Sequence, residues 1–237
     1  MPAARSRLCR TRFDGPRIGS GEVRSRYRVK EIFYTLQGEG SHAGRPAVFC
    51  RFTSCNLWTG RESDRHRAIC QFCDTDFVGT DGPGGGRFSS PADLASAIAS
   101  TWQGKDHARS RPYVVCTGGE PLLQLDAEAV EALHRKGFEV AIETNGTRPA
   151  PSGIDWVCVS PKAGADLVLT SGDELKLVFP QPGLDPEQFV ELDFTHLRLQ
   201  PMDGPDLPAN TEAAIEYCLA HPQWQLSLQT HKYIGIR

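Results

Sequence analysis

Three cysteines in polar surroundings have the residue type and spacing best suited to chemistry. Fourteen residues separate Cys55 from Cys70, and two more separate Cys70 from Cys73. As thiolates, such residues bind metals, and two kinds of centre are compatible with three of them. Together with His66, which lies between them in the sequence, they could form a structural zinc site of three cysteines and one histidine.

The second possibility is an iron–sulfur cluster. A [4Fe–4S] cluster normally takes four thiolates, so three would leave one iron open for chemistry. That iron can accept the amino and carboxylate groups of S-adenosylmethionine, and an electron delivered through the cluster can then cleave the sulfonium and release a carbon radical. The cysteines alone leave both possibilities open and slightly favour zinc.

The other five of the eight cysteines do not suggest a metal site. Cys50, Cys116 and Cys158 lie inside apolar runs, where we expect inert buried thiols, and we assign no role to Cys9 or Cys218. A framework of four disulfides is typical of small secreted domains. We do not expect one in a chain of 237 residues that shows no export signal.

The elements that must position these cysteines are short apolar strands alternating with helices. Alternation of this kind predicts an α/β fold with a parallel sheet or barrel. We expect strands at residues 47–52, 113–117, 139–144, 156–160, 175–179, 196–200 and 225–229. We expect helices at residues 91–102, capped by Ser89 or Ser90, at 126–136, closed by Gly137, and at 211–220.

Small and polar residues follow five of these strands. They are residues 117–121, 143–146, 160–162, 200–203 and 229–232. Because parallel strands end at one edge, such residues together predict a site there. For S-adenosylmethionine, Glu120 could take the amino group, Lys162 and Ser160 the carboxylate, and Glu143 the ribose, with backbone near residues 200–202 at the adenine.

Residues 70–73 together with the Gly-Gly-Glu-Pro run at 118–121 resemble the radical S-adenosylmethionine superfamily. Within it, the chain resembles the 7-carboxy-7-deazaguanine synthase family from about residue 32 to the C-terminus. The elements that carry this resemblance are residues 33–40, 73–75, 143–147, 160–162 and 229–232. The Gly-Gly-Glu-Pro run alone is moderately specific, whereas the full ordered set is highly specific.

The resemblance implies a fold, cofactors and a reaction. The implied fold is an incomplete, partial TIM-type barrel of about six parallel strands in a homodimer. The implied cofactors are a [4Fe–4S] cluster, S-adenosylmethionine and Mg²⁺. The implied reaction contracts the ring of 6-carboxy-5,6,7,8-tetrahydropterin to give 7-carboxy-7-deazaguanine, with loss of ammonia, in deazapurine biosynthesis of the queuosine type.

The resemblance also assigns the site residues. The cluster ligands are Cys55, Cys70 and Cys73. The expected cofactor contacts are Phe72, Asp74, Gly119, Glu120, Glu143, Ser160, Pro161, Lys162, Gln200, Pro201, Met202 and Asp203. The expected substrate contacts are Leu36, Gln37, Gly38, Glu39, Arg51, Thr117, His231 and Arg237, with Arg51 suited to the substrate carboxylate. Thr75 matches the Mg²⁺ position.

One feature departs from the superfamily pattern. Its first two cysteines are usually three residues apart, so the fourteen residues here include eleven extra, within an insert at residues 56–69. We interpret the insert as a solvated excursion that leaves the ligands convergent. Its charges, among them Arg61, Arg65 and Arg67, suggest a docking surface for a flavodoxin-type reductant.

Composition limits the other possibilities. A formal net charge of −3 argues against a nucleic-acid footprint over the whole chain, and no apolar run predicts a membrane span. With no export signal visible, we expect a cytoplasmic protein. Residues 1–28 contain eight arginines and predict a flexible basic arm, with nucleic-acid binding as an alternative. Residues 29–237 form a single predicted domain.

Two other functions remain open from the sequence. A glycyl-radical activase would share Cys55, Cys70, Cys73 and Glu120 but would lack a cage for a small substrate. A zinc-stabilised binding domain without enzymatic activity would use the same cysteines as structural ligands. Iron and sulfide reconstitution separates the second from both enzymes.

Overall fold

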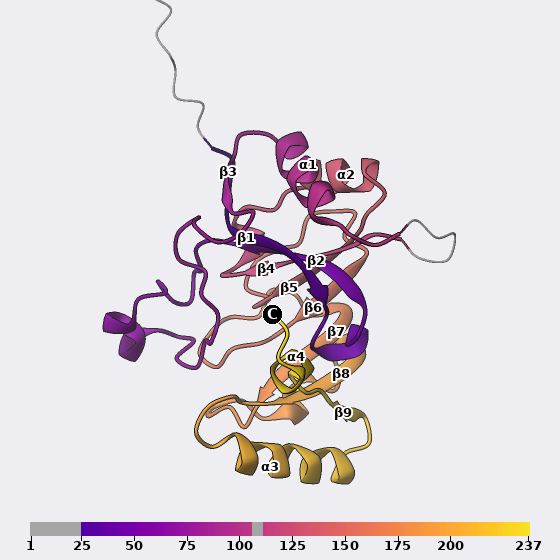
Figure 1. Ribbon diagram of the computed structural model, residues 1–237. Helices are drawn as coiled ribbons and strands as arrows, with labels where there is room; N and C mark the ends of the chain where they lie inside the picture. Colours follow the sequence, from indigo (N-terminus) through magenta and orange to yellow (C-terminus); the bar gives the residue numbers. More distant parts are fainter. Residues whose placement is uncertain (1–24, 106–110) are drawn as a thin grey trace, which may run out of the picture.

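The computed structural model describes residues 25–105 and 111–237, and its central feature is a nine-stranded sheet (Figure 1). The strands follow the spatial order β3-β1-β2-β4-β5-β6-β7-β8-β9. Their bounds are β1 (Tyr27–Leu36), β2 (Pro46–Phe52), β3 (Gly86–Phe88), β4 (Tyr113–Gly118), β5 (Glu139–Thr144), β6 (Trp156–Val159), β7 (Ser171–Phe179), β8 (Asp193–Pro201) and β9 (Trp224–Leu226). Most of the expected N-terminal arm, residues 1–24, lies outside the described residues.

Neighbouring strands from β2 to β9 are all parallel, whereas β1 runs antiparallel to both β2 and β3. Within the described residues, β3 and β9 are the two edges of the sheet, which therefore does not close on itself. This arrangement confirms the expected α/β architecture of an incomplete barrel built on parallel strands. Parallel order brings the carboxyl ends of β2 and β4–β9 to one edge.

Three longer helices cover the outer face of the sheet, and a short fourth helix lies near the C-terminus (Figure 1). They are α1 (Pro91–Thr101), α2 (Ala127–Arg135), α3 (Leu207–Ala220) and α4 (Thr230–Ile234). Helix α1 packs on β1 and β2, α2 on β5, and α3 on β8 and β9. No helix within the described ranges is both long and apolar enough to cross a membrane.

Side-chain alternation along the strands separates the helix-facing core from the inside of the barrel. In β4, Val114 and Cys116 belong to the core beneath α1 and α2, whereas Tyr113 and Val115 face the inner side. The next inward position is Thr117, close to the carboxyl end of the strand. Because the strand period is two, apolar inner residues give way to polar ones at this end. The same alternation positions the candidate site.

The predicted elements were largely confirmed, with differences of a few residues at their ends. Ser90 caps α1 and Asp126 caps α2, each by accepting a hydrogen bond from a backbone N–H in the first turn. The expected strand at residues 225–229 is shorter, since β9 ends at Leu226 and α4 begins at Thr230. The sequence analysis did not predict β1, in which Lys30 and Glu31 interrupt the apolar pattern.

Candidate active site

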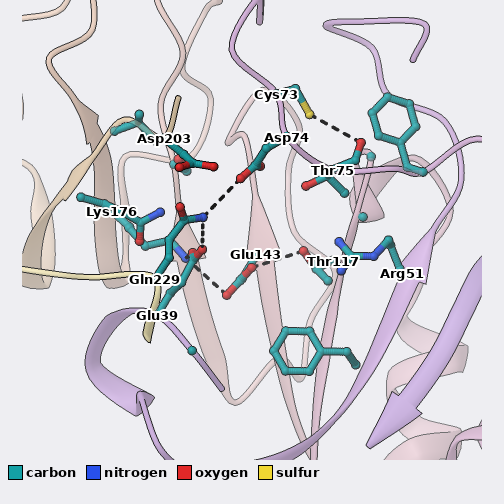
Figure 2. Close-up of a pocket in the computed structure, with 18 of the residues that line it drawn as sticks. Glu39, Arg51, Cys73, Asp74, Thr75, Thr117, Glu143, Lys176, Asp203 and Gln229 are labelled. Carbon is teal, nitrogen blue, oxygen red and sulfur yellow. Dashed lines mark hydrogen bonds and ion pairs between the residues drawn. The ribbon is translucent and has the colours of Figure 1, made fainter. Parts of the chain in front are cut away.

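A cavity of about 370 Å³ opens where the parallel strands end (Figure 2). One wall is the cluster loop, which we define as residues 53–77. The opposite wall, which we call the strand wall, is formed by residues between 31 and 39, on and after β1, and by inner-face residues of β2, β4, β5, β6, β7 and β8. Residues 229–237 contribute a further side. Segments from nearly the whole described chain therefore meet around one space.

All three candidate cluster ligands line this cavity. The hydrogen bond from Cys70 lowers the pKa of the Cys73 thiol to about 6, so Cys73 readily supplies a thiolate. Three thiols on one wall of a cavity are an arrangement that can hold an iron–sulfur cluster with one iron facing the open space.

Arg65 organises the cluster loop from within. Its guanidinium donates to the backbone oxygens of Gln71 at 2.8 Å and Cys73 at 3.0 Å. It also pairs with Glu62 and lies 4.0 Å from the ring centroid of Trp58. The insert therefore folds back on the segment that carries the cysteines, and the sequence analysis missed this role of Arg65.

His66, the proposed fourth zinc ligand, is exposed in the short 3₁₀ helix Glu62–Arg67 and does not line the cavity. Its backbone oxygen accepts a hydrogen bond from Gln71 Nε2. The imidazole thus lies outside the wall on which the three thiols are found, which argues against a zinc site of three cysteines and His66.

Two glycines let the end of β4 approach the first cysteine. Gly118 has a φ of 113°, a conformation that side chains with a Cβ rarely adopt. A Cβ on Gly119 would overlap the backbone oxygen of Ser54. The close contact is fixed by hydrogen bonds from Gly119 N to Phe52 O at 3.0 Å and from Glu120 N to Ser54 O at 2.8 Å.

Glu120, the expected contact of the cofactor amino group, is fully buried and does not line the cavity. Its carboxylate accepts hydrogen bonds from Leu122 N, Thr144 Oγ1 and Asn145 N, at 2.9, 2.8 and 2.8 Å. Burial raises its pKa, and these hydrogen bonds oppose the rise. In this structure Glu120 fixes the turn after β5 against the turn after β4.

The segment after β6 places a lysine beside the cysteines. Lys162 Nζ donates to Ser160 O at 2.7 Å and to Ser160 Oγ at 2.6 Å, and it lies 5.9 Å from the Phe72 ring centroid. Burial lowers the pKa of Lys162. Both Lys162 and Ser160 line the cavity. Their cation and hydroxyl suit the carboxylate of an amino acid.

The other expected cofactor contacts divide into two groups. The residues that line the cavity are Phe72, Asp74, Gly119, Glu143, Gln200, Pro201 and Asp203. The two that do not, besides Glu120, are Pro161 and Met202. The backbone N–H of Met202 donates to Phe179 O at 2.7 Å. Met202 therefore joins the ends of β7 and β8 through its backbone.

A network of buried polar side chains occupies the strand wall (Figure 2). Lys176 Nζ lies 2.5 Å from Glu39 Oε2 and 3.4 Å from Glu143 Oε1. Gln37 Nε2 donates to Glu143 Oε1 at 3.0 Å, and Thr117 Oγ1 donates to Glu143 Oε2 at 3.3 Å. Fixed carboxylates of this kind can accept hydrogen bonds from the N–H groups of a bound heterocycle.

Arg51 reaches the same cavity from the end of β2. Its Nε donates to Glu31 Oε1 at 2.9 Å, and Glu31 also pairs with the guanidinium of Arg237. Glu31, which the sequence analysis did not identify, is only 6% exposed. Because Glu31 engages Arg51 through Nε, it orients a guanidinium that can fork around a carboxylate through its terminal nitrogens.

The remaining predicted contacts also line the cavity. They are Leu36, Gly38, Thr75 and His231. A Cβ on Gly38 would overlap the imidazole of His231, so these two residues are in close contact. Asp74 accepts hydrogen bonds from Lys232 at 2.6 Å and from Gln229 at 3.3 Å. The C-terminal segment is thereby tied to the cluster loop.

Lys176 is the most central residue that the sequence analysis missed. It lies within the expected strand at residues 175–179, two positions after Glu174. Two charged residues at a spacing of two within an apolar strand were a usable signal, because both must point to the same face. That face is the inside of the barrel.

Comparisons with known proteins give a consistent result. Residues 65–176 match the model of the radical SAM superfamily. The 7-carboxy-7-deazaguanine synthase of Caulobacter vibrioides is 63% identical over 210 residues, covering 89% of this chain and 99% of that protein. The enzyme of the same name from Bordetella pertussis is 66% identical over the same share of each chain. The crystal structure of QueE from Escherichia coli, 28% identical, superposes with a TM-score of 0.63 and covers 86% of this chain and 94% of that one.

Proposed function

Because the chain belongs to the 7-carboxy-7-deazaguanine synthase family of radical S-adenosylmethionine enzymes, we propose that it forms 7-carboxy-7-deazaguanine from 6-carboxy-5,6,7,8-tetrahydropterin with loss of ammonia. The observation that carries this proposal is that three thiols and a cage of fixed carboxylate, amide and guanidinium groups line one cavity. One wall suits a cluster with an open iron, and the other suits a small polar heterocycle. This product enters deazapurine biosynthesis of the queuosine type.

The cofactor half of the cavity uses the cluster loop and the segments after β4, β6 and β8. Cys55, Cys70 and Cys73 would hold the [4Fe–4S] cluster. When bound, this cluster supplies the electron that cleaves S-adenosylmethionine to a 5′-deoxyadenosyl radical. Lys162 and Ser160 support binding of the cofactor carboxylate, since their polar groups converge beside the thiols.

The substrate half uses the strand wall. Gln37, Glu39 and Glu143 offer amide and carboxylate groups to the pyrimidine edge of the pterin. Arg51, oriented by Glu31, offers its terminal nitrogens to the substrate carboxylate. Thr117 and His231 lie at the same end of the barrel and complete the cage.

As part of this proposal, Thr75 provides a ligand for Mg²⁺. Its hydroxyl is a hard ligand, and Mg²⁺ usually keeps several waters and takes other oxygens from the substrate. Asp74 is already bound to Lys232 and Gln229, which leaves its neighbour Thr75 as the better candidate. We expect Thr75→Ala to raise the Mg²⁺ concentration that gives half-maximal turnover. An unchanged Mg²⁺ dependence would refute this assignment.

We further propose a flavodoxin-type reductant that docks on the insert at residues 56–69. Arg61 and Arg67 are exposed there, whereas Arg65 is engaged in the cluster loop. The test is therefore Arg61→Gln with Arg67→Gln, leaving Arg65 in place, and the expected result is slower cluster reduction by flavodoxin at low salt. Equal rates in variant and wild type would exclude this surface.

The cell compartment and assembly are part of the same proposal. All seven described cysteines are free thiols, which is typical of a reducing compartment and supports a cytoplasmic location. We also propose a single catalytic domain over residues 29–237 that acts as a homodimer, to be checked by the molar mass of the reconstituted protein in solution.

The decisive experiment is an anaerobic assay of the reconstituted protein with the carboxytetrahydropterin, S-adenosylmethionine, reductant and Mg²⁺. The expected result is 7-carboxy-7-deazaguanine and ammonia in equal amounts. A protein that binds the cluster and cleaves S-adenosylmethionine but leaves the pterin unchanged would contradict the proposal and favour another radical enzyme, such as a glycyl-radical activase.

A further inference from the structure

A lysine on an inner face of the barrel is a costly feature. Lys176 lies in β7 between Leu175 and Leu177, which point to the helix-facing core, and its own side chain is only 6% exposed. An ammonium group removed from water is expensive unless opposite charges surround it. The groups around Lys176 therefore indicate the role of its charge.

Two carboxylates from distant parts of the chain meet at this ammonium group. Glu39 follows β1, and Glu143 lies on β5. The distances from Lys176 Nζ are 2.5 Å to Glu39 Oε2 and 3.4 Å to Glu143 Oε1. Without the lysine, two negative charges would face each other in a partly enclosed cavity.

Neutral donors hold the other carboxylate oxygen atoms. Gln229 Nε2 donates to Glu39 Oε1 at 2.9 Å, and Thr117 Oγ1 donates to Glu143 Oε2 at 3.3 Å. These donors fix orientation but supply no charge. Within the described residues, Lys176 is the cation that directly contacts both carboxylates, and the other contacting groups are neutral.

Charged and titratable groups surround Lys176 and its carboxylate partners. Those acting on Lys176 are Glu39 after β1, Glu143 on β5, Cys158 on β6, Lys162 after β6 and Glu174 on β7. Arg198 on β8 lies beside Lys176 in the strand register and donates to Ser41 Oγ, and His231 on α4 acts on Glu39. Burial alone would raise the pKa of Glu39, but Lys176 lowers it to about 2. Burial opposes the charge on Lys176, yet the surrounding carboxylates raise its pKa. These interactions therefore favour Lys176 as a cation and Glu39 as an anion.

We propose that Lys176 is a positioning residue for substrate recognition, which keeps Glu39 ionised and holds Glu39 and Glu143 correctly spaced to accept hydrogen bonds from the pyrimidine N–H groups. This inference rests on the proposed function, because those N–H groups belong to the pterin. A protonated carboxyl group would present an O–H donor to an N–H donor of the substrate, and the hydrogen bond between them would be lost. Lys176 acts through the two carboxylates and does not itself contact the substrate.

The experiment compares Lys176→Met with Arg26→Met. Arg26 is a suitable control, since its guanidinium also joins two carboxylates, Asp126 at 2.7 Å and Glu128 at 2.5 Å, and all three residues lie outside the cavity lining. In Lys176→Met we expect the KM for the pterin to rise about 10–100-fold, the effect of losing a hydrogen bond to a charged group. The kcat at saturating pterin should change much less, and Arg26→Met should keep the wild-type KM.

The pH profile distinguishes positioning from a merely structural role. Without the cation, burial raises the pKa of Glu39, so Glu39 takes up a proton more readily and the KM of Lys176→Met should rise as the pH falls. Lys176→Gln, which keeps a hydrogen-bond donor and removes only the charge, should show the same profile and remains informative if the Met variant does not fold. A wild-type KM in Lys176→Gln at every pH would overturn the proposal.

Infrared spectroscopy of the substrate-free protein gives a second readout. An additional band of a protonated carboxylic acid, beyond any present in the wild type and Arg26→Met, should appear in Lys176→Met and should disappear again when Glu39→Gln is added. A raised KM without this band or the pH profile would mean a structural role and refute the inference. If the wild type does not convert the pterin, the proposed function fails, whereas the infrared result tests the charge balance independently.

Discussion

The cluster loop and the strand wall face each other across one cavity, but different interactions hold them in place. The loop, residues 53–77, has little regular structure, and local contacts such as Arg65 to Gln71 O and Cys73 O determine its shape. The strand wall consists of side chains on parallel strands, fixed by buried hydrogen bonds between residues far apart in the sequence, such as Lys176 and Glu39. The difference suggests that the cluster completes the loop, whereas the strand wall is already organised without it.

The largest effect should come from removing a cluster ligand. In Cys73→Ala, two thiolates cannot hold the cluster with one open iron, so we expect iron content and turnover to fall to background. The unfolding transition of the metal-free protein should remain unchanged, because the hydrogen bonds of Cys73, such as those with Arg65 and Thr75, lie inside the loop. The matched control is Cys218→Ala on α3, which should retain iron.

If Cys73→Ala destabilised the metal-free protein as strongly as a core mutation would, the proposed independence of the two walls would be wrong. Iron and sulfide analysis together with thermal unfolding of the metal-free protein measures both quantities.

A smaller effect is expected when the loop loses its internal support. Arg65→Ala removes the hydrogen bonds to two backbone oxygens beside the cysteines, and we expect iron to be lost to a chelator about 10–100-fold faster, the usual cost of removing an outer-shell partner of a metal site. The control is Arg67→Ala, an exposed arginine in the same 3₁₀ helix. Equal rates of iron release in both variants would show that Arg65 does not support the loop.

The ion pair between Glu39 and Lys176 in the strand wall should make the stability of the protein depend on pH under acidic conditions. The pKa of Glu39 is lowered from 4.5 to about 2 in the folded protein, so its contribution to stability is complete above about pH 4.5 and is lost as the pH falls toward 2. We expect on the order of 3 kcal/mol, given about 1.4 kcal/mol for each unit of pKa between 4.5 and about 2.

This contribution is measured by denaturant unfolding of the metal-free protein between pH 5 and 2. Glu39→Gln should lose less stability than the wild type over that range. If both proteins lose stability in parallel, the pairing of Glu39 with Lys176 is not what stabilises the wall.

Much of this fold follows from the sequence, because each buried strand is an apolar run that ends in small or polar residues. The thiols and the turn glycines were also predictable, since motif spacing identifies them. The partners of Glu31 and Lys176 were not predictable, because they lie 20 and 137 residues away and only the fold brings them together. For Lys176, the spacing from Glu174 indicated the inner face but not the carboxylates it meets there. Glu120 is the opposite case. Its motif identified it as a cofactor contact, but its hydrogen bonds in the structure are with the turns after β4 and β5.

The smallest expected effect tests a single hydrogen bond in the strand wall. Thr117→Val preserves shape and removes the donor to Glu143 Oε2, so the KM for the pterin should rise about 2–10-fold with unchanged iron content. Thr101→Val, at the end of α1, removes a hydroxyl that donates to Ala97 O and serves as the control. A loss of iron in Thr117→Val would mean that the two walls are coupled.

The C-terminal segment meets the end of β1 and the cluster loop at the cavity. Thr35 Oγ1 donates to Arg237 O at 2.8 Å, Thr230 N donates to Gly38 O at 2.8 Å, and Lys232 pairs with Asp74. Residues 229–237 follow every strand of the described sheet along the chain and add no strand to it. A proteolytic cut between β9 and α4 would therefore leave every strand in place while freeing one side of the cavity, so the integrity of the substrate cage depends on a segment outside the sheet.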